Sequence, residues 1–233
     1  MIFLASKNIL VIIPARGGSK GIPGKNLKKL GGKPLIAYPI ELAKSIKEIN
    51  KVVVSTDSKK IAGVAKKYGA EVPFIRPANL AKDNVPTLPV LQHCVSFLEK
   101  RGYKADLIIL LYPTCPFITK QTVKKAISLL KTKKCNSVLS VEEDYGRFWV
   151  YNKLRKKHVP FYPKKRLNRQ YYKPLLRENG AIYFSNYSVI MKKKKLIDDK
   201  SVKFIVMNPN EMSDLDTLED WKDAEKRINK NRK

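Results

Sequence analysis

Residues 14–26 combine glycines with cations in a pattern that suits the binding of phosphate groups. The stretch reads Pro-Ala-Arg-Gly-Gly-Ser-Lys-Gly-Ile-Pro-Gly-Lys-Asn and holds four glycines and three cations. Glycines let backbone N–H groups approach a ligand closely, and amides arranged in this way cradle anions. Arg16, Lys20 and Lys25 add full positive charges that can pair with phosphate oxygens. This glycine-rich loop is the first candidate binding site.

The glycine spacing excludes two common nucleotide-binding loops. It matches neither the Gly-x-x-x-x-Gly-Lys-Ser/Thr loop of many ATPases nor the Gly-x-Gly-x-x-Gly loop of dinucleotide-binding domains. A solvated surface turn is the alternative. However, the loop directly follows the apolar run 9–13, which predicts a buried strand, and open α/β sheets bind ligands at the carboxyl ends of their strands. We therefore favour a phosphate-binding loop.

Two carboxylates separated by one residue form the second candidate site. In an extended segment the side chains of residues i and i+2 point to the same side, so Asp214 and Asp216 are expected to converge. Converging carboxylates repel each other unless a cation lies between them, and Mg²⁺ binds through a few carboxylates, waters and substrate phosphates. The alternative is a helix cap, with Asp216 near the N-cap and Glu219 three residues later.

Six segments, in order along the chain, give a resemblance to a known family. The first is 15–26, taken together with 32–36; the others are 54–57, 76–78, 113–116, 179–183 and 214–217. Over nearly its whole length the chain resembles the acylneuraminate cytidylyltransferases, or CMP-sialic acid synthetases. The resemblance implies a Mg²⁺-dependent enzyme that converts CTP and a nonulosonic, sialic-acid-like sugar acid into the CMP-sugar and pyrophosphate.

The resemblance also implies roles for the residues at matching positions. Arg16 and Lys25 would hold the triphosphate and act in catalysis together with Asp214 and Asp216, which would bind the metal. Arg76 would contact the base, although a lone surface arginine is the alternative for it. The full set of expected nucleotide-binding residues is Ala15, Arg16, Gly17, Ser19, Lys25, Asn26, Arg76 and Thr87.

The expected sugar site departs from the family pattern at one residue. The sialate enzymes typically place a Gln before Pro-Thr-Ser-Pro, whereas here Tyr112 precedes Pro-Thr-Cys-Pro. A phenol cannot reproduce the paired donor and acceptor of an amide, so we expect a relative of N-acetylneuraminate such as legionaminate or pseudaminate. Arg169, Gln170 and Asn179 are the other expected sugar-binding residues; Arg169 either pairs with the substrate carboxylate or is one more cation in a basic stretch.

Two other functions remain open at the level of sequence. One is a cytidylyltransferase for a different 2-keto sugar acid, such as 3-deoxy-manno-octulosonate. The other is a basic RNA-associated α/β protein, because the formal net charge is +28. The excess is mostly lysine and is spread along the chain, and clusters such as 192–195 carry no interleaved aromatic residues, so we expect no specific nucleic-acid partner. The positive field should instead attract an anionic nucleotide and an anionic sugar acid.

Apolar segments that suit strands alternate with segments of helical spacing. The expected strands are 9–13, 51–55, 71–75, 106–112, 136–141, 180–186 and 203–207. The expected helices are 34–47, 58–68, 87–100, 119–132 and 217–229, with caps at Asp57-Ser58 and Thr119 and with Trp221 and Ala224 on the buried side of the last helix. This alternation predicts an α/β fold of Rossmann-like, nucleotide-diphospho-sugar transferase type, whose mostly parallel sheet has helices on both faces.

The pattern breaks at residues 143–175, which read as irregular and rich in aromatic and basic residues. The aromatic residues are Tyr145, Phe148, Trp149, Tyr151, Phe161, Tyr162, Tyr171 and Tyr172. Such a stretch is either a second core or an interface. The resemblance favours a small inserted dimerisation lobe that closes over the neighbouring active site. We therefore expect a homodimer, with a core of residues 1–142 and 176–233.

Three features bear on where the protein works. No apolar run approaches the ~18–20 residues needed to span a bilayer, so we expect no membrane association. The three cysteines are widely spaced and predict neither a disulfide framework nor a zinc site. We expect a cytoplasmic protein, since that compartment is reducing and supplies nucleoside triphosphates. His93, on an expected helix, reads as a packed residue rather than a catalytic one.

Overall fold

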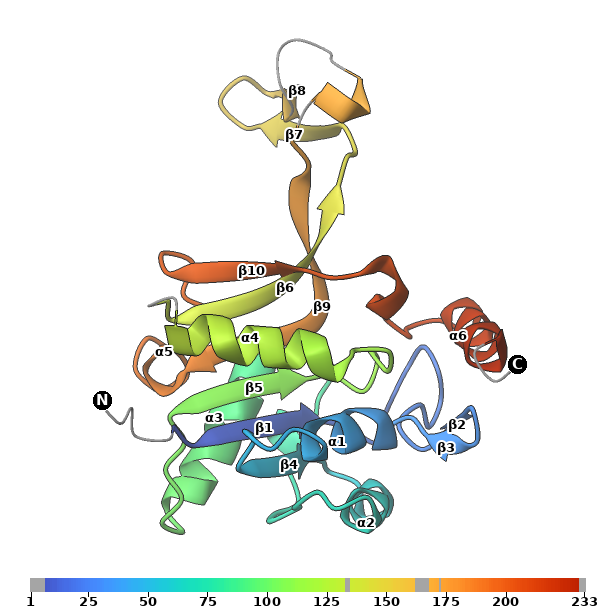
Figure 1. Cartoon of the computed structure of the whole chain (residues 1–233), viewed down its shortest axis with the longest axis vertical. Helices are drawn as coiled ribbons and strands as arrows, with labels where there is room; N and C mark the ends of the chain where they lie inside the picture. Colours follow the sequence, from blue (N-terminus) through green and yellow to red (C-terminus); the bar gives the residue numbers. More distant parts are fainter. Residues whose placement is uncertain (1–6, 133–134, 162–167, 172, 231–233) are drawn as a thin grey trace.

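A six-stranded sheet forms the centre of the molecule (Figure 1). The computed structural model describes residues 7–132, 135–161, 168–171 and 173–230. In sheet order the strands are β10 (Val202–Val206), β6 (Ser137–Asp144), β9 (Leu175–Asn186), β5 (Leu107–Leu111), β1 (Ile9–Pro14) and β4 (Lys51–Ser55). β1 pairs in parallel with β4 and β5, and β10 with β6, whereas β9 runs antiparallel between β5 and β6. The predicted mostly parallel sheet is confirmed.

Helices cover both faces of this sheet, as predicted. Successive residues of β1 are buried against opposite faces, Leu10 and Ile12 on one and Ile9, Val11 and Ile13 on the other. α1 (Ala37–Lys44), α2 (Lys59–Lys67) and α4 (Lys120–Thr132) pack on the second face. α3 (Thr87–Glu99) and the short α5 (Tyr187–Met191) pack on the first face. Within the described residues no helix is long and apolar enough to cross a membrane.

A third, smaller apolar cluster joins the glycine-rich loop to the C-terminal part of the chain. Ile22 of the loop is buried with Leu215, which lies between the two candidate aspartates, and with Trp221 of α6 (Leu218–Lys230). Leu30 of the short hairpin formed by β2 (Lys29–Leu30) and β3 (Lys33–Pro34) completes the cluster. The cluster therefore fixes the position of the loop relative to Asp214 and Asp216.

An extension of β6 and β9 carries a projecting lobe. The two strands remain paired as far as Asp144 opposite Leu175, and beyond them lie β7 (Phe148–Asn152), β8 (Lys157–Phe161) and η2 (Arg169–Tyr171) (Figure 1). β7 and β8 form an antiparallel hairpin, so the expectation of an irregular segment is wrong. The boundaries expected at 143 and 175 fall within the paired ends of β6 and β9. Tyr162 and Tyr172 lie outside the described residues.

Several local predictions differ from the structure. Residues 71–75 form no strand, and only an isolated bridge joins Glu71 to Val53. The helix expected at 34–47 spans only Ala37–Lys44, and the strand expected at 180–186 is the end of the longer β9. The hairpin β2–β3, α5 and the single-turn helices η1 (Ala78–Leu80) and η3 (Pro209–Glu211) were not predicted.

The expected caps and the final helix are confirmed. Ser58 Oγ accepts the N–H of Ile61, and Thr119 Oγ1 accepts the N–H of Thr122. Trp221 and Ala224 form the buried side of α6.

The close approach of the loop to the C-terminal segment generates a prediction for two glycines. A Cβ on Gly21 would lie 2.1 Å from the backbone oxygen of Asp216, whereas a Cβ on Gly18 would meet nothing within 4 Å. Gly21→Ala should therefore lower the free energy of unfolding by about 1–3 kcal/mol through overpacking. Gly18→Ala should leave it within about 0.5 kcal/mol of wild type. Urea denaturation measures both, and equal values for the two variants would contradict this packing.

Candidate active site

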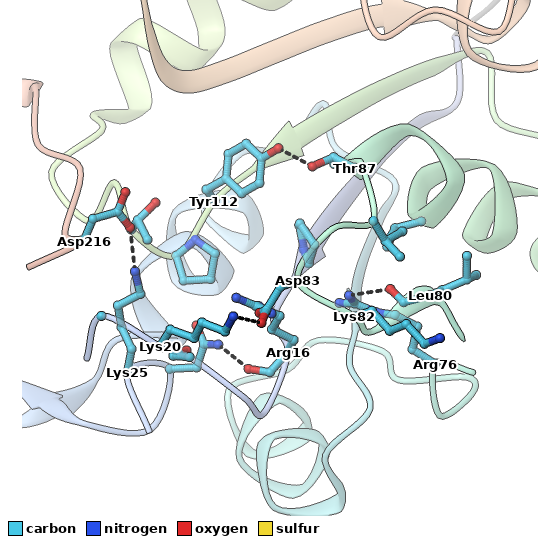
Figure 2. Close-up of a pocket in the computed structure, with 18 residues that line it drawn as sticks. Arg16, Lys20, Lys25, Arg76, Leu80, Lys82, Asp83, Thr87, Tyr112 and Asp216 are labelled. Atoms are coloured by element: carbon cyan, nitrogen blue, oxygen red, sulfur yellow. Dashed lines mark hydrogen bonds and ion pairs between the residues drawn. The ribbon is translucent and has the colours of Figure 1, made fainter. Parts of the chain in front are cut away.

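A pocket of about 490 Å³ opens at the carboxyl ends of β1 and β5 (Figure 2). Its lining brings together residues from the glycine-rich loop, from the segment before α3, from the end of β5 and from the C-terminal segment. Eight of the predicted site residues line it: Arg16, Ser19, Lys25, Asn26, Arg76, Thr87, Tyr112 and Asp216. Lys20, the third cation of the glycine-rich loop, also lines it, as do Lys82, Asp83 and Thr114, which were not predicted.

Hydrogen bonds to neighbouring elements hold the glycine-rich loop. The N–H of Ala15 donates to Ser55 O at 2.9 Å, and the N–H of Gly17 donates to Asp57 Oδ1 at 2.8 Å. Asn26 is 7% exposed, and its Nδ2 donates to the carbonyl of Arg16 at 3.0 Å. These residues thus shape the loop, and their predicted contacts with a nucleotide stay predictions.

Lys25 connects the loop to the acidic segment. Its side chain is 12% exposed, and its Nζ donates to Leu215 O at 2.7 Å and to Asp216 Oδ1 at 2.9 Å. The ammonium group therefore lies between the glycine-rich loop and the predicted metal-binding residues, where it can contact a bound phosphate and Asp216 together.

The segment 214–216 is not extended, contrary to the geometry assumed from sequence. The N–H of Asp216 donates to the carbonyl of Asp214 at 3.0 Å, which closes a three-residue turn. Asp216 lines the main pocket, whereas Asp214 lines a neighbouring hollow of about 170 Å³. Burial raises the pKa of Asp214, and repulsion by Asp216 raises it further, so the two carboxylates lie close enough to interact.

The first turn of α6 is capped by other residues than predicted. Thr217 Oγ1 accepts the N–H of Asp220 at 3.2 Å, and Asp220 Oδ2 accepts the N–H of Thr217 at 2.7 Å. The proposed cap formed by Asp216 and Glu219 is therefore wrong. Because Thr217 and Asp220 cap the helix, the carboxylate of Asp216 is left to pair with Lys25.

The donor set of Asp214 and Asp216 fits Mg²⁺ better than a metal that needs a complete protein cage. The described residues contain no group of three or more His, Cys, Asp or Glu side chains that could hold a metal ion. Mg²⁺ is commonly bound by one or two carboxylates and completes its octahedron with waters and substrate phosphates. Two interacting carboxylates beside a cationic loop meet that requirement.

Tyr112 belongs to a chain of hydroxyl and ring contacts at the side of the pocket. Its Oη lies 2.6 Å from Oγ1 of Thr87, and its ring packs edge-on against Tyr183 with centroids 6.3 Å apart. Tyr183 in turn donates to Glu178 Oε2 at 3.1 Å. Burial raises the pKa of Tyr112, so its phenol is protonated at neutral pH. The predicted nucleotide residue Thr87 and the predicted sugar residue Tyr112 are therefore directly linked.

Asn179 lies on β9 outside the pocket lining. Its Oδ1 accepts from Ser140 Oγ at 2.7 Å and from the N–H of Ala181 at 3.2 Å, but its buried Nδ2 has no partner among the described residues. The adjacent Gly180 has φ +71°, and a Cβ there would lie 3.9 Å from Asp214 Oδ2. Asn179 is thus held beside the acidic segment, and its Nδ2 is available to donate a hydrogen bond.

Arg76 acts in the structure as an internal brace. It is 5% exposed, its Nε donates to Ser55 Oγ at 3.1 Å, and its NH2 donates to Ser55 O. The alternative of a lone surface arginine is wrong. Arg76 also lines the pocket, so its predicted contact with the base stays a prediction.

The structure does not bring Arg169 and Gln170 to the pocket of their own chain. Both lie on η2 in the projecting lobe, where the guanidinium of Arg169 stacks 4.3 Å from the ring centroid of Tyr145.

His93 was predicted to be a packed residue. Its ring lies edge-on against that of Phe74, with centroids 4.6 Å apart.

Sequence reasoning missed Asp83, which pairs with both Arg16 and Lys20. Its Oδ2 lies 2.6 Å from Lys20 Nζ. Asp83 is the carboxylate of Lys82-Asp83-Asn84, in a chain with 48 Lys and Arg but only 20 Asp and Glu. Acidic residues are scarce in so basic a chain, and one that lies near a predicted phosphate site was the signal that could have identified Asp83.

The sequence is similar to those of several known proteins. The sequence model of a family described as cytidylyltransferases matches residues 10–208. The chain is 33% identical over 221 residues to the CMP-N,N'-diacetyllegionaminic acid synthase of Legionella pneumophila, covering 94% of this chain and 95% of the relative. It is 31% identical over 214 residues to the pseudaminic acid cytidylyltransferase of Campylobacter jejuni, covering 91% and 92%.

A solved structure shares the fold. A CMP:2-keto-3-deoxy-manno-octonic acid synthetase complexed with CTP superposes with a TM-score of 0.70 at 18% identity, over 96% of this chain and 99% of the other. The α/β nucleotidyltransferase fold predicted from sequence is thereby confirmed.

Proposed function

Because this chain belongs to the cytidylyltransferase family, we propose that it transfers the cytidylyl group of CTP to a nonulosonic sugar acid. The products are the CMP-sugar and pyrophosphate. The observation that carries the proposal is the single pocket in which loop cations, Asp216 and Tyr112 meet. The cations suit a triphosphate, and the protonated phenol suits a sugar substituent. The RNA-associated alternative leaves this pocket unexplained.

The reaction requires alignment and charge neutralisation rather than a covalent protein intermediate. The anomeric hydroxyl oxygen attacks the α-phosphorus, the bond from that phosphorus to the bridging oxygen breaks, and pyrophosphate leaves as the hydroxyl gives its proton to solvent water. Arg16 and Lys20 lie where they can neutralise the leaving pyrophosphate, and Lys25 where it can orient a phosphate against the acidic segment. Asp214 and Asp216 would hold Mg²⁺, which when bound polarises the α-phosphate.

The side chain of Tyr112 favours a substrate sugar acid that carries acylamido and deoxy groups. One hydroxyl and a flat apolar ring match such a substrate better than a fully hydroxylated side chain, because unmatched buried polar groups are costly. The relatives from Legionella and Campylobacter are named for legionaminic acid and pseudaminic acid, and these names favour the same class of sugar acid. The 3-deoxy-manno-octulosonate alternative rests on a likeness of fold at 18% identity.

We also propose that the enzyme works as a homodimer through its lobe. Apolar side chains on the lobe are exposed, with Leu154 at 97%, Phe161 at 57% and Tyr151 at 52%. Clustered exposed apolar residues are typical of protein interfaces. Arg169 lies on the same lobe, so a second chain is needed to bring it to a sugar site.

A cytoplasmic location is proposed as well, since Cys94, Cys115 and Cys135 are unpaired and buried.

The substrate proposal predicts a preference among nucleotides and sugar acids. Pyrophosphate release should be supported by CTP far better than by ATP, GTP or UTP. With CTP, N,N'-diacetyllegionaminate or pseudaminate should give the highest kcat/KM, ahead of N-acetylneuraminate and 3-deoxy-manno-octulosonate. Equal use of ATP and CTP would refute the cytidylyl assignment.

Tyr112→Gln and Tyr112→Phe serve as the matched pair within that panel. Gln restores an amide and should shift selectivity toward N-acetylneuraminate by about tenfold, while Phe, which lacks the hydroxyl, should not. A wild-type preference for N-acetylneuraminate would remove Tyr112 as the selectivity element.

The metal proposal predicts different effects for substitutions at two neighbouring residues, one on turnover and one on stability. Asp216→Asn removes a charge from the cation site and should lower kcat by about a hundredfold or more at any Mg²⁺ concentration. Thr217→Ala removes the cap of α6 and should cost about 1 kcal/mol of unfolding free energy with little change in kcat. Steady-state kinetics and thermal unfolding test both; an active Asp216→Asn enzyme would rule out the metal role.

The dimer proposal predicts complementation between two inactive variants. Arg169→Ala lacks a residue that acts on the other subunit's pocket, and Asp216→Asn lacks one that acts in its own. Co-expressed with different tags and purified as a mixed dimer population, they should recover about a quarter of wild-type activity, because half the dimers carry one intact site. Light scattering should show a dimer. A fully active monomer, or no recovery on mixing, would overturn the arrangement.

A further inference from the structure

Asp83 places a carboxylate among the cations expected to bind phosphate. It lies on the connection between η1 and α3 and points into the pocket toward Arg16 and Lys20 (Figure 2). Arg16 NH1 forms an ion pair with Asp83 Oδ1, and Lys20 Nζ lies 2.6 Å from Asp83 Oδ2. One carboxylate therefore bridges both cations, with one oxygen for each.

This arrangement does not fit a residue that contacts a bound triphosphate. A carboxylate and a phosphate group are both anions, and they repel each other at short range. The arrangement does fit a carboxylate that occupies the place of a phosphate oxygen. The two cations, 32% and 78% exposed at their side chains, would otherwise face the open pocket unpaired.

The segment that carries Asp83 is a partly exposed turn rather than a packed element. Between Ala81 and Pro86 it forms turns and no regular helix or strand, and Val85 N–H to Lys82 O, at 3.2 Å, is the backbone bond that closes its turn. The side chain of Asp83 is 39% exposed, so its release toward solvent requires no rearrangement of the core. Exposed ion pairs of this kind contribute little to stability.

We propose that Asp83 is a stand-in anion for the nucleotide phosphates. In the free enzyme it holds Arg16 and Lys20 in position over the glycine-rich loop. A bound triphosphate displaces it and takes both cations, and after transfer the carboxylate competes with pyrophosphate for them and promotes product release. This proposal depends on the proposed function in one respect, namely that the ligand carries a chain of phosphates.

Asp83→Asn tests the proposal because it keeps the shape and removes the competing charge. Inorganic tripolyphosphate is the probe, titrated calorimetrically into the full-length enzyme without Mg²⁺ and with it. Asp83→Asn should lower the Kd for tripolyphosphate and the inhibition constant of pyrophosphate by about tenfold each. Asp83→Glu, which restores the charge, should behave like wild type. In turnover, Asp83→Asn should lower the KM for CTP and raise sensitivity to pyrophosphate.

Glu48→Gln is the matched control for net charge. Glu48 pairs with Lys124 at 3.8 Å and lies outside the pocket lining, so its loss changes the overall charge equally without touching the phosphate site. It should leave the Kd for tripolyphosphate near the wild-type value. An effect as large as that of Asp83→Asn would assign the result to the general field of the protein and overturn the proposal.

Three other results would also overturn it. Weaker tripolyphosphate binding by Asp83→Asn, with recovery in Asp83→Glu, would make Asp83 a support for Arg16. A loss of affinity confined to titrations with Mg²⁺ would make it a metal ligand. An unchanged Kd would leave an ordinary surface ion pair. Because tripolyphosphate carries neither base nor sugar, these outcomes are independent of whether CTP is the preferred nucleotide.

Discussion

The contact between the glycine-rich loop and segment 214–216 is the constraint on which the site depends. Residues about 190 positions apart meet there, with Lys25 bonded to Leu215 O and to Asp216. Gly21 leaves no room for a side chain against the Asp216 backbone, and Ile22 packs with Leu215 and Trp221. Burying this apolar cluster supplies the free energy that keeps cations and carboxylates at a short distance. The glycine-rich loop and Asp216 thus line one pocket.

The electrostatics of the pocket follow from that contact. The chain carries a formal net charge of +28, which attracts anions from a distance. Within the pocket, however, Lys25 is paired with Asp216, and Arg16 and Lys20 are paired with Asp83. These pairs fix the directions of long, flexible side chains before a ligand arrives. The cations of the pocket are therefore already held by carboxylates, and a ligand that carries phosphates would have to exchange partners with them.

Sequence patterns predicted the core well and the surface poorly, for physical reasons. Strands such as β1 and β5 are buried on both faces, so their continuous apolar runs are unambiguous. β7 is largely exposed, and its run of aromatic and apolar residues lacks the alternation with polar residues that marks a half-buried strand. The turn at 214–216 depends on a single hydrogen bond, which residue spacing does not specify. The cap of α6 has the Thr-x-x-Asp spacing of a capping box at Thr217 and Asp220, and this signal was missed. The pairing of Arg16 with Asp83 joins separate loops, and only the folded chain brings them together.

β9 is the element through which the lobe and the site are joined. Its start, at Leu175, pairs at the base of the lobe, and its end, at Phe184, lies in the core. Between them the pairing with β6 shifts register around Ser140, whose hydroxyl bonds to Asn179 and to the backbone of Ile182. Gly180, with φ +71°, turns the chain there toward Asp214.

Such irregularities bend a strand pair and redirect its side chains. Here the bend places Asn179 beside the acidic segment, on the strand that carries the lobe. The register shift and the positive-φ Gly180 thus lie on the strand that joins the lobe to the sheet. The glycine-rich loop is fixed separately, because Lys25 and Ile22 anchor it to the C-terminal segment.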